Sequence, residues 1–387
     1  MMHPNSVTVI GAGLAGLRTV ERLRQRGYAG RIMLLGAERH LPYDRPPLSK
    51  QVLRGEADDP WLRPGGHYAG LDTDIRLDQR VRELDTTRRV LRCDDGELPY
   101  DVLVIATGAS PRRVPGLNGR VLRTLDDARE LRGALRPGTR LAIVGAGLIG
   151  CEVAASARSM GADVDLIDVL PGPLIRVVGA RVCDVVADLH REHGVRLHMG
   201  TPATRAAAGP LTLADGTELA ADVVLEAIGA VPETGWLEGS LLRLDDGVCC
   251  DAAGRAVDAA GRAADGVYAA GDVARWDGVR NEHWTNAGEQ ADRVAAAILG
   301  QEPPPAAPPY WWSDQYDLKL QGLGAPGPDD GVHLIKWGPK SRTVALYHRD
   351  GRLTGAVGFS AAAAVMKLRA DITAGTAIGS VLDRLTT

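Results

Sequence analysis

The sequence predicts an α/β protein in which two domains are built on parallel sheets and a small α+β domain follows them. The first observation is a phrase that occurs twice, as "VTVIGAGLAGL" at Val7–Leu17 and as "LAIVGAGLIGC" at Leu141–Cys151. In each copy, a short apolar run precedes a glycine turn and apolar residues at helical spacing follow it. The second observation is the alternation of apolar and polar residues after Tyr310, which is typical of half-buried strands.

The first copy of the phrase predicts a strand, a turn, a helix and a second strand. Val7–Ile10 forms the first strand and Gly11–Gly16 the turn, while apolar spacing predicts a helix over Leu14–Arg26. Gly27 ends this helix, and "RIMLL" after it predicts the next strand.

The second copy predicts the same order of elements. Leu141–Val144 forms a strand, Gly145–Gly150 an elbow, and the helix after it runs to Met160. Gly161 ends that helix and Val164–Ile167 forms the next strand. Each copy is one mononucleotide-binding unit, so the chain has two Rossmann-like domains.

The remaining segments predict further strands, a linker and a third domain. "YDVLVIATGASPRRVPG", "ADVVLEAIGAVPET" and "DGVYAAGDVARW" each place a strand before a glycine turn. Pro303–Pro309 predicts a stiff linker. Alternating stretches and a helix near Ala361–Ala370 then predict the α+β domain.

Composition excludes several classes of protein. The chain has 387 residues, a formal net charge of −4 and 45% hydrophobic residues, whereas nucleic-acid binding usually brings a basic excess. We find no run of 18 apolar residues and no signal-peptide pattern, so we expect a soluble, cytoplasmic protein with no membrane partner. Five scattered cysteines, an odd number, indicate reduced thiols.

The two glycine elbows predict dinucleotide binding. In such a loop the first glycine permits the tight turn, the second lets the backbone approach a pyrophosphate, and the third lets helix and strand pack. The helix that follows presents free N–H groups and a partial positive charge to the phosphates. These glycines are Gly11, Gly13 and Gly16 in the first copy and Gly145, Gly147 and Gly150 in the second.

An acidic residue follows the second strand of each unit. Glu38 and Asp168 are placed to accept hydrogen bonds from a ribose. A carboxylate at Asp168 accepts the 2′-hydroxyl of NAD and repels the 2′-phosphate of NADP, so NADH is expected over NADPH. Arg176, eight residues later, keeps NADPH as the alternative.

Three further phrases give the chain a resemblance to a known family. "LPYDRPPLSK" (Leu41–Lys50), "EHWTNAGEQ" (Glu282–Gln290) and "WWSDQYDLKLQ" (Trp311–Gln321) look like the flavoprotein ferredoxin reductases that serve oxygenases and cytochromes P450, among them putidaredoxin and rubredoxin reductases. The resemblance implies a glutathione-reductase-like fold, FAD in the first unit and NADH in the second. It implies an FAD-binding domain over 1–112 and 235–307, an NAD-binding domain over 113–234 and a C-terminal interface domain over 308–387. It also implies a [2Fe–2S] ferredoxin, or a similar one-electron carrier, as the electron acceptor.

The resemblance also assigns site residues. Asp272 would accept from the ribityl chain, and Trp284 would lie by the pyrimidine edge of the flavin. The implied FAD site is Gly11, Gly13, Ala15, Gly16, Glu38, Arg45, Lys50, Val81, Thr107, Gly108, Arg123, Gly271, Asp272 and Trp284, and the implied NAD site is Gly145, Gly147, Ile149, Gly150, Glu152, Asp168 and Gly229. No metal site is implied.

The sequence departs from the family pattern at two positions. Ala37 stands where relatives often place the ribose acid, so Glu38 must reach from the next position. Ala227 stands where the family tends to have glycine, and its methyl group would shift the nicotinamide or weaken NADH binding.

The resemblance places Lys50 near flavin N5, paired with Glu152, as the catalytic residues. The chain has only five lysines among 45 basic residues, and Lys50 is the only one before Lys319. A compact ammonium fits where a planar guanidinium does not, which favours a functional role over an ordinary surface lysine. Hydride would pass from the nicotinamide to the flavin, so no side-chain nucleophile is needed.

Three other functions compete with this one. A disulfide reductase or a cysteine-based NADH oxidase or peroxidase needs a redox cysteine in "GAERHLPYDRPPLSK", and because this segment has none, the sequence argues strongly against that class. A redox-signalling flavoprotein like apoptosis-inducing factor, with slow NADH oxidation, remains as an alternative. A reductase for a rubredoxin or another one-electron carrier is the third.

Three minor patterns receive ordinary interpretations. Cys249-Cys250 is read as part of a strand because adjacent cysteines bridge with poor geometry, and "HREH" at His190–His193 as a solvated helix end. His283 lies beside Trp284 and could relay protons, but a proton relay is not the favoured interpretation of this residue.

Overall fold

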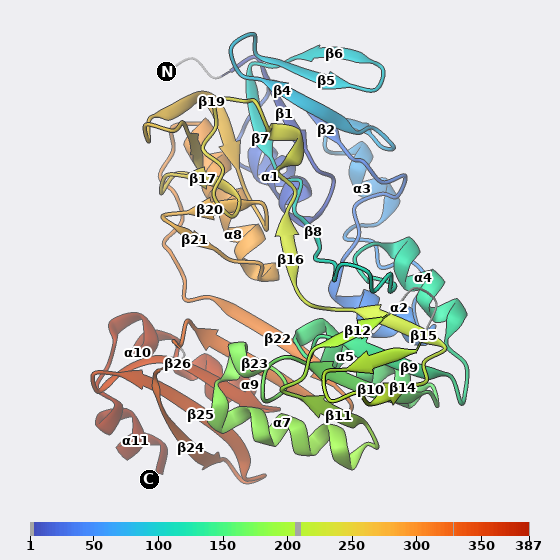
Figure 1. Cartoon of the computed structure of the whole chain (residues 1–387). Helices are drawn as coiled ribbons and strands as arrows, with labels where there is room; N and C mark the ends of the chain where they lie inside the picture. Colours follow the sequence, from blue (N-terminus) through green and yellow to red (C-terminus); the bar gives the residue numbers. More distant parts are fainter. Residues whose placement is uncertain (1–3, 206–209, 328, 387) are drawn as a thin grey trace. The chain divides into compact units, whose positions relative to one another are not determined.

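The computed structural model describes residues 4–205, 210–327 and 329–386, and it confirms the predicted α/β class (Figure 1). The chain divides into two compact units. The first unit comprises Met1–Asp44, Asp59–Ser110 and Val231–Ala306, and the second unit comprises Arg45–Asp58, Pro111–Ala230 and Ala307–Thr387. None of the described helices is long and apolar enough to cross a membrane.

The first unit is organised around a nine-stranded sheet whose central strands are parallel. The strand order is β21-β20-β17-β18-β19-β7-β1-β2-β3. The bounds are β1 Ser6–Ile10, β2 Arg31–Leu35, β3 Asp74–Arg76, β7 Val102–Ile105, β17 Val248–Cys250, β18 Arg255–Val257, β19 Ala263–Ala269, β20 Ala274–Trp276 and β21 Val279–Arg280.

Both faces of this sheet are covered. Helices α1 (Leu14–Gln25) and α8 (Trp284–Ile298) pack against each other and against one face (Figure 1). In β7, Val102 and Val104 face these helices, whereas Leu103 and Ile105 face a second core. A strand buried on both faces reads as a continuous apolar run, which is why "VLVI" shows no alternation. A small sheet and a short helix complete the unit, with β4 Val81–Asp85, β5 Val90–Cys93, β6 Gly96–Pro99 and α3 Gly65–Ala69.

The second unit begins with a four-stranded parallel sheet in the order β11-β10-β9-β15. Its strands are β9 Arg140–Val144, β10 Asp163–Asp168, β11 Arg196–Met199 and β15 Val223–Glu226. Helix α5 (Leu148–Ser159) follows β9 and packs against β9 and β10. The other helices of this region are η1 Pro46–Ser49, α2 Gln51–Arg54, α4 Leu125–Ala134, α6 Ile175–Val178 and α7 Ala180–Glu192.

Two smaller sheets follow, of which β12-β13-β14 belongs to the second unit, while β8 and β16 are the segments where the chain passes from one unit to the other and the helix η2 belongs to the first unit. One has the order β12-β13-β14, and the other pairs β8 with β16. Their strands are β8 Ala109–Pro111, β12 Ala203–Arg205, β13 Leu211–Leu213, β14 Glu218–Leu219 and β16 Ala230–Pro232, and the 3₁₀ helix η2 spans Gly235–Leu237.

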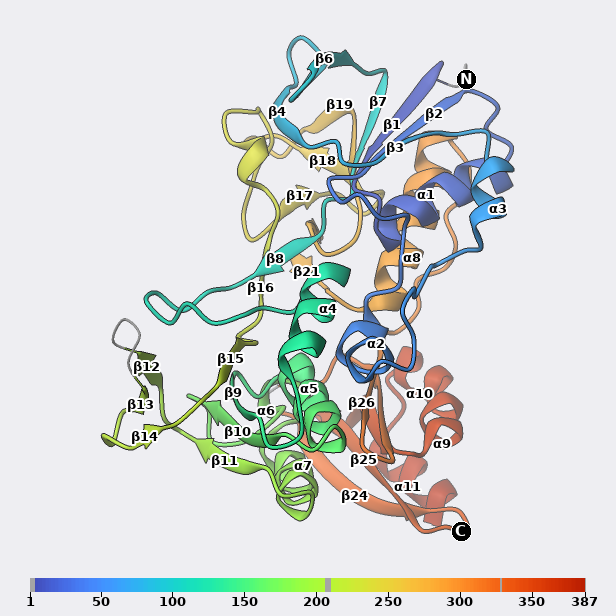
Figure 2. The same ribbon diagram turned by 90° about the vertical axis from the view of Figure 1, so that its right-hand side faces the viewer.

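The C-terminal part of the second unit is an antiparallel sheet in the order β22-β23-β26-β25-β24. Side chains of β25 alternate between two cores, because Ala345 and Tyr347 belong to the core that includes residues of α5, while Val344 and Leu346 belong to the core of the last helices. Figure 2 shows those last helices beside the sheet. The elements are β22 Tyr310–Gln315, β23 Leu318–Gly324, β24 Gly331–Trp337, β25 Arg342–Arg349, β26 Arg352–Phe359, α9 Ala362–Lys367, α10 Arg369–Ala374 and α11 Ile378–Thr386. The predicted helix near Ala361–Ala370 is therefore two short helices that meet at Leu368.

Candidate functional site: two glycine elbows and a buried lysine–glutamate pair

The first elbow has the geometry that its three glycines predict. Gly11 has φ +108°, and a Cβ there would lie 2.2 Å from the carbonyl oxygen of Ala106. A Cβ on Gly16 would lie 1.9 Å from the oxygen of Gly11, so only glycine allows α1 to pack this closely. A Cβ on Gly13, in contrast, would meet no described protein atom within 4 Å.

The second elbow repeats the first nearly contact for contact. Gly145 has φ +111°, and a Cβ there would lie 2.3 Å from the oxygen of Ala227. A Cβ on Gly150 would lie 1.9 Å from the oxygen of Gly145, whereas Gly147 again faces open space. The two elbows therefore share one local structure, although they lie in different units.

These features fit a dinucleotide pyrophosphate at each elbow. Gly13 and Gly147 are the N-cap residues of α1 and α5, and neither helix start is capped by a side-chain hydrogen bond. The first-turn N–H groups thus lie beside an open surface, where a phosphate would accept hydrogen bonds. A methyl group on either glycine would occupy the space that such a phosphate needs.

The two acidic residues that are predicted to bind a ribose are held in different ways. Asp168 is tied to backbone N–H groups, with Oδ2 accepting from Ala146 at 2.6 Å and Oδ1 from Leu170 at 2.8 Å. Glu38 instead accepts a hydrogen bond from the hydroxyl of Tyr43 at 2.6 Å. Asp168 is therefore fixed directly to the second elbow, whereas Glu38 is held by a side chain five residues away.

Other residues that the resemblance assigns to the flavin lie in the same unit as the first elbow. The Cβ that Gly271 lacks would lie 2.8 Å from that of Ala15, and Gly271 donates its N–H to Gln290 Oε1. Trp284, the first residue of α8, donates its indole N–H to Asp44 at 2.7 Å. Burial lowers the pKa of His283, and the nearby Asp272 carboxylate opposes that shift.

Lys50 and Glu152 form a buried ion pair in the second unit. Lys50 Nζ lies 2.7 Å from Glu152 Oε2 and donates to the carbonyl of Pro46 at 3.0 Å. Both side chains are about 4% exposed. An ion pair at this depth keeps its electrostatic strength because water does not screen it.

The remaining assigned residues are placed as follows. The Arg45 guanidinium donates to the carbonyl of Arg123 in the second unit, and Ile149 is 43% exposed in the first turn of α5. Thr107 donates its hydroxyl to the carbonyl of Glu233. Val81 begins β4, Gly108 accepts at its carbonyl from the N–H of Glu233, and Gly229 accepts at its carbonyl from the N–H of Arg112.

Sequence reasoning missed the residues that complete the surroundings of Glu152. Ser49 Oγ donates to Glu152 Oε2 at 2.5 Å and Ser313 Oγ donates to Oε1 at 2.7 Å. A signal existed, because in β22 the buried positions Trp311, Ser313 and Gln315 alternate with less buried ones. Two polar residues on the buried face of a strand require hydrogen-bond partners inside the protein.

The interpretation of "HREH" as a solvated helix end is wrong for His190. The His190 side chain is fully buried at the end of α7 and contacts Tyr316 and Gln315. Val182, Val186 and His190 lie four residues apart, so they share the buried stripe of α7. His193 is exposed, as predicted, and stacks on the ring of Tyr316.

The cysteines carry no redox pair in this structure. Cys249 and Cys250 are free thiols in β17, which confirms the strand interpretation, and the other three are free as well. Burial raises the pKa of the Cys151 and Cys250 thiols. Among the described residues, no group of three or more His, Cys, Asp or Glu side chains is arranged to hold a metal ion.

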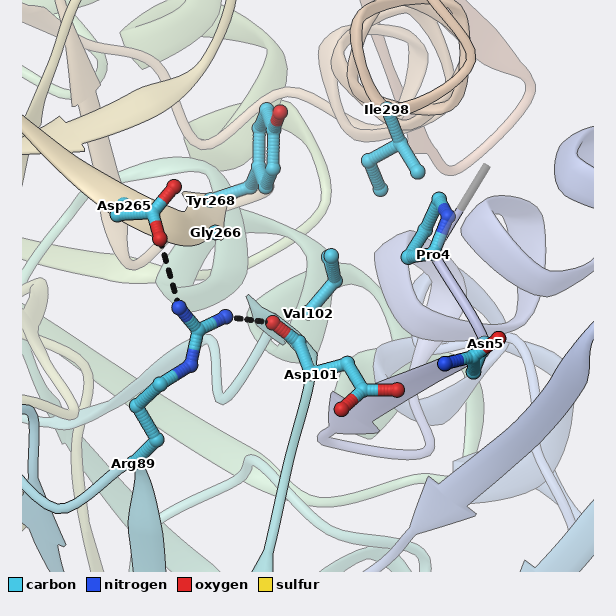
Figure 3. A pocket seen from close by; sticks show the side chains of 9 residues that line it. All are labelled: Pro4, Asn5, Arg89, Asp101, Val102, Asp265, Gly266, Tyr268 and Ile298. Atoms are coloured by element: carbon cyan, nitrogen blue, oxygen red, sulfur yellow. Dashed lines mark hydrogen bonds and ion pairs between the residues drawn. The ribbon is translucent and has the colours of Figure 1, made fainter. Parts of the chain in front are cut away.

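The first unit contains a pocket of about 380 Å³ whose lining includes no residue of the elbow (Figure 3). Its lining includes Asn5, Asp101 and Val102, at the amino ends of β1 and β7. Arg89 spans it, bonded to Asp265 at 2.7 Å and to the carbonyl of Asp101. Because ligands of such sheets bind at the carboxyl ends of the strands, this pocket is no part of the nucleotide site.

Glu226 is a buried carboxylate at the end of β15. It accepts hydrogen bonds from the N–H of Val114 at 2.6 Å, the N–H of Gly119 at 2.8 Å and the guanidinium of Arg113 at 3.1 Å. It thereby fastens the loop 113–119 next to Ala227, whose N–H donates to the carbonyl of Val144.

Comparisons with known proteins agree with these features. The ferredoxin reductase component of chlorobenzene dioxygenase from Cupriavidus sp. (strain PS12) is 38% identical over 390 residues, covering 95% of this chain and 93% of the relative. The ferredoxin–NAD(+) reductase subunit of the benzene 1,2-dioxygenase system from Pseudomonas putida is 38% identical, covering 92% and 90%. The crystal structure of the covalent putidaredoxin reductase–putidaredoxin complex matches with a TM-score of 0.89 and 31% identity, covering 96% of this chain and 93% of that one.

Two family models cover most of the chain. The model described as "Reductase C-terminal" matches residues 310–382, which contain the five-stranded sheet and most of the helices after it. The model described as "Pyridine nucleotide-disulphide oxidoreductase" matches residues 5–291, which contain both elbows, and the chain belongs to this family.

Proposed function

We propose that the protein is an NADH-dependent flavoprotein reductase that passes single electrons to a [2Fe–2S] ferredoxin, or a similar one-electron carrier, serving an oxygenase or a cytochrome P450. The observation that carries this proposal is the pair of matching elbows, each with an open second glycine and an uncapped helix start. The relatives named above are ferredoxin reductases of oxygenase systems, which supports the same reaction class.

In this proposal each elbow binds one cofactor. The first would hold FAD and the second NADH, within an FAD-binding domain over 1–112 and 235–307, an NAD-binding domain over 113–234 and an interface domain over 308–387. When bound, the flavin accepts a hydride equivalent from NADH and releases electrons one at a time. The chain itself supplies binding, orientation and electrostatics.

Individual residues support these roles. Asp168, held by two backbone N–H groups, presents a carboxylate that would accept a ribose hydroxyl and repel the extra phosphate of NADPH. Lys50 supplies a buried ammonium whose charge is matched by Glu152. The N-terminus of α8, at Trp284, adds a partial positive charge that would favour an anionic ring.

The alternatives are less well supported. The segment from Gly36 to Lys50 has no cysteine, so a thiol-based oxidase or disulfide reductase has no redox partner beside the flavin. A signalling flavoprotein would form a long-lived charge-transfer complex with NAD and reduce slowly, and the relatives named above are electron-transfer reductases. We also propose that the protein acts in the cytoplasm, in keeping with the proposed reaction.

The test uses the purified full chain. Its FAD content is measured after denaturation, and anaerobic titrations with NADH and with NADPH follow the flavin absorbance. Cytochrome c reduction is then measured with and without [2Fe–2S] ferredoxins. We expect bound FAD, a preference for NADH and a strong dependence on the ferredoxin. A colourless chain that cannot be reconstituted with FAD, or reduction that ferredoxin does not accelerate, would contradict the proposal.

A further inference from the structure

Glu152 lies at the meeting point of three hydrogen-bond donors inside the second unit. Lys50 and Ser49 donate to Oε2, at 2.7 and 2.5 Å, and Ser313 donates to Oε1 at 2.7 Å. All four residues are buried, with exposed fractions of 4% or less. A carboxyl group that accepts three hydrogen bonds is an ionised carboxylate, because in the protonated form one of its two oxygens would donate a hydrogen bond.

A chain of hydrogen bonds continues from Ser313 into α7. Gln315 Nε2 donates to Ser313 Oγ at 3.2 Å, and Gln315 Oε1 lies 3.1 Å from His190 Nε2. His190 Nδ1 lies 3.0 Å from the hydroxyl of Tyr316, whose ring stacks on exposed His193. Ser313, Gln315 and His190 are each 0% exposed, so water does not interrupt the chain between Glu152 and His190.

The polarity of this chain follows from the chemistry of its groups. A serine hydroxyl that donates to Glu152 can only accept from Gln315, so the amide nitrogen faces the serine and the amide oxygen faces His190. His190 must therefore carry its proton on Nε2 and accept at Nδ1 from Tyr316. Burial lowers the pKa of His190 to about 4, which keeps the ring neutral near pH 7.

We propose that Ser313, Gln315 and His190 are positioning residues that orient the Glu152 carboxylate as an anion and thereby hold the Lys50 ammonium in one place. The proposal rests on the proposed function, in which Lys50 acts beside the flavin. The chain orients groups and does not conduct protons, because an amide passes a proton on only by becoming an imidic acid. Every donor along it points toward Glu152.

The arrangement explains why polar residues occupy positions that an apolar core would otherwise fill. Ser313 and Gln315 come from β22, which packs against α5, the helix that carries Glu152, and His190 comes from α7. If Ser313 is lost, Glu152 keeps both Oε2 donors but its Oε1 is left without this one. The carboxylate is then held through Oε2 alone and can turn about that oxygen, so the position of the Lys50 ammonium, whose other bond is to the carbonyl of Pro46, is fixed less tightly.

The first experiment is independent of flavin and of activity. Protein labelled with ¹⁵N-histidine is studied by NMR at pH 7, and the His190 signals are assigned with His190→Asn. We expect a single tautomer with the proton on Nε2. Ser313→Ala should convert the single tautomer of His190 into a mixture of tautomers. Without the Ser313 hydroxyl, the Gln315 amide group is free to flip and to exchange the positions of its oxygen and its nitrogen. If the wild-type His190 ring carried its proton on Nδ1, the hydrogen bonds between His190 and Glu152 could not all point toward Glu152, and the proposal would be overturned.

The second experiment measures flavin reduction by NADH in stopped flow for Ser313→Ala and Gln315→Met. We expect the limiting rate to fall roughly tenfold or more, up to about a hundredfold for a displaced group. The apparent dissociation constant for NADH and the FAD content should stay within about twofold, since neither residue lies at the elbows. Two variants are used so that the failure of one to fold leaves the other as the test.

Tyr347→Phe is the matched control. Tyr347 donates a buried hydrogen bond from the C-terminal sheet to the carbonyl of Val178, at 2.7 Å, and takes no part in the chain to Glu152. This variant should keep both the His190 tautomer and the reduction rate. Wild-type rates in both test variants would overturn the positioning role. If the wild-type flavin is not reduced by NADH at all, the proposed function fails instead, and the tautomer result still decides the polarity of the chain.

Discussion

Gly147→Ala separates nucleotide binding from folding at the second elbow. Gly147 has φ −78° and ψ −171°, a conformation open to any residue, and a Cβ there meets no described protein atom within 4 Å. The methyl group should therefore leave the fold intact and collide only with a phosphate placed against the backbone. Forcing a methyl group into a filled space costs about 1–3 kcal/mol, which corresponds to a dissociation constant for NADH that is roughly 5- to 150-fold weaker.

The assay is an anaerobic titration of the yellow protein with NADH, combined with a measurement of FAD content and thermal unfolding. Gly147→Ala should keep its flavin and unfold within about 2 °C of the wild type, since a surface change rarely exceeds about 0.5 kcal/mol. The reciprocal variant Gly13→Ala should instead lose flavin while folding normally, because its Cβ is equally unobstructed.

Two control variants define what the result means. Gly133→Ala places a methyl group in α4, where it also meets nothing within 4 Å, and should leave NADH binding unchanged. Gly150→Ala should fail to fold normally, because its Cβ would lie 1.9 Å from the oxygen of Gly145. Wild-type affinity for NADH in Gly147→Ala would refute the reasoning, since no pyrophosphate would then approach this elbow.

Three further predictions concern buried charged or titratable groups. Lys50→Arg should keep FAD but slow flavin reduction in stopped flow roughly tenfold or more, because a planar guanidinium does not fit the ammonium site; an unchanged rate removes Lys50 from the mechanism. Burial lowers the pKa of His190 to about 4. As the pH falls from about 6.5 to 4, His190 therefore becomes protonated in the unfolded chain but stays neutral in the folded protein, which favours unfolding. The free energy of unfolding, measured in urea titrations, should drop by about 3 kcal/mol over that pH range. If a His190→Gln variant showed the same dependence of this free energy on pH, His190 would not be its cause. Glu226→Ala should cost about 1–3 kcal/mol by leaving the N–H groups of Val114 and Gly119 without their acceptor, and hydrogen exchange at these two amides should accelerate; unchanged exchange would show that other groups hold the loop.

The elbows could be predicted from the sequence because their physics is local. A tight turn with φ above +100° at Gly11 and Gly145, and close contact between helix and strand at Gly16 and Gly150, demand glycine within six residues. The predicted helix over Leu14–Arg26 differs from the observed Leu14–Gln25 by a single residue. Local propensity and local sterics were sufficient there.

Beyond Lys50, which the resemblance pairs with it, the partners of Glu152 could not be predicted, because they come from distant parts of the chain. Ser49 precedes Glu152 by 103 positions and Ser313 follows it by 161. Nothing in either local sequence specifies which residue will lie opposite in the folded protein. The error at His190 has the same origin, since a histidine in the last turn of a helix is solvated or buried according to what packs on that helix.

The structure also links the second elbow to the buried ion pair through a single rigid element. Helix α5 begins at the elbow, with its first N–H groups beside Gly147, and carries Glu152 only five residues further along. A nucleotide bound at this helix start and the carboxylate that fixes Lys50 are thus positioned by the same turns of helix. Because the methyl group of Gly147→Ala meets no described protein atom within 4 Å and so leaves α5 in place, the variant should weaken NADH binding yet preserve the Nε2–H tautomer of His190. A changed tautomer would mean that the elbow and the ion pair are coupled by deformation of α5, not by its rigidity.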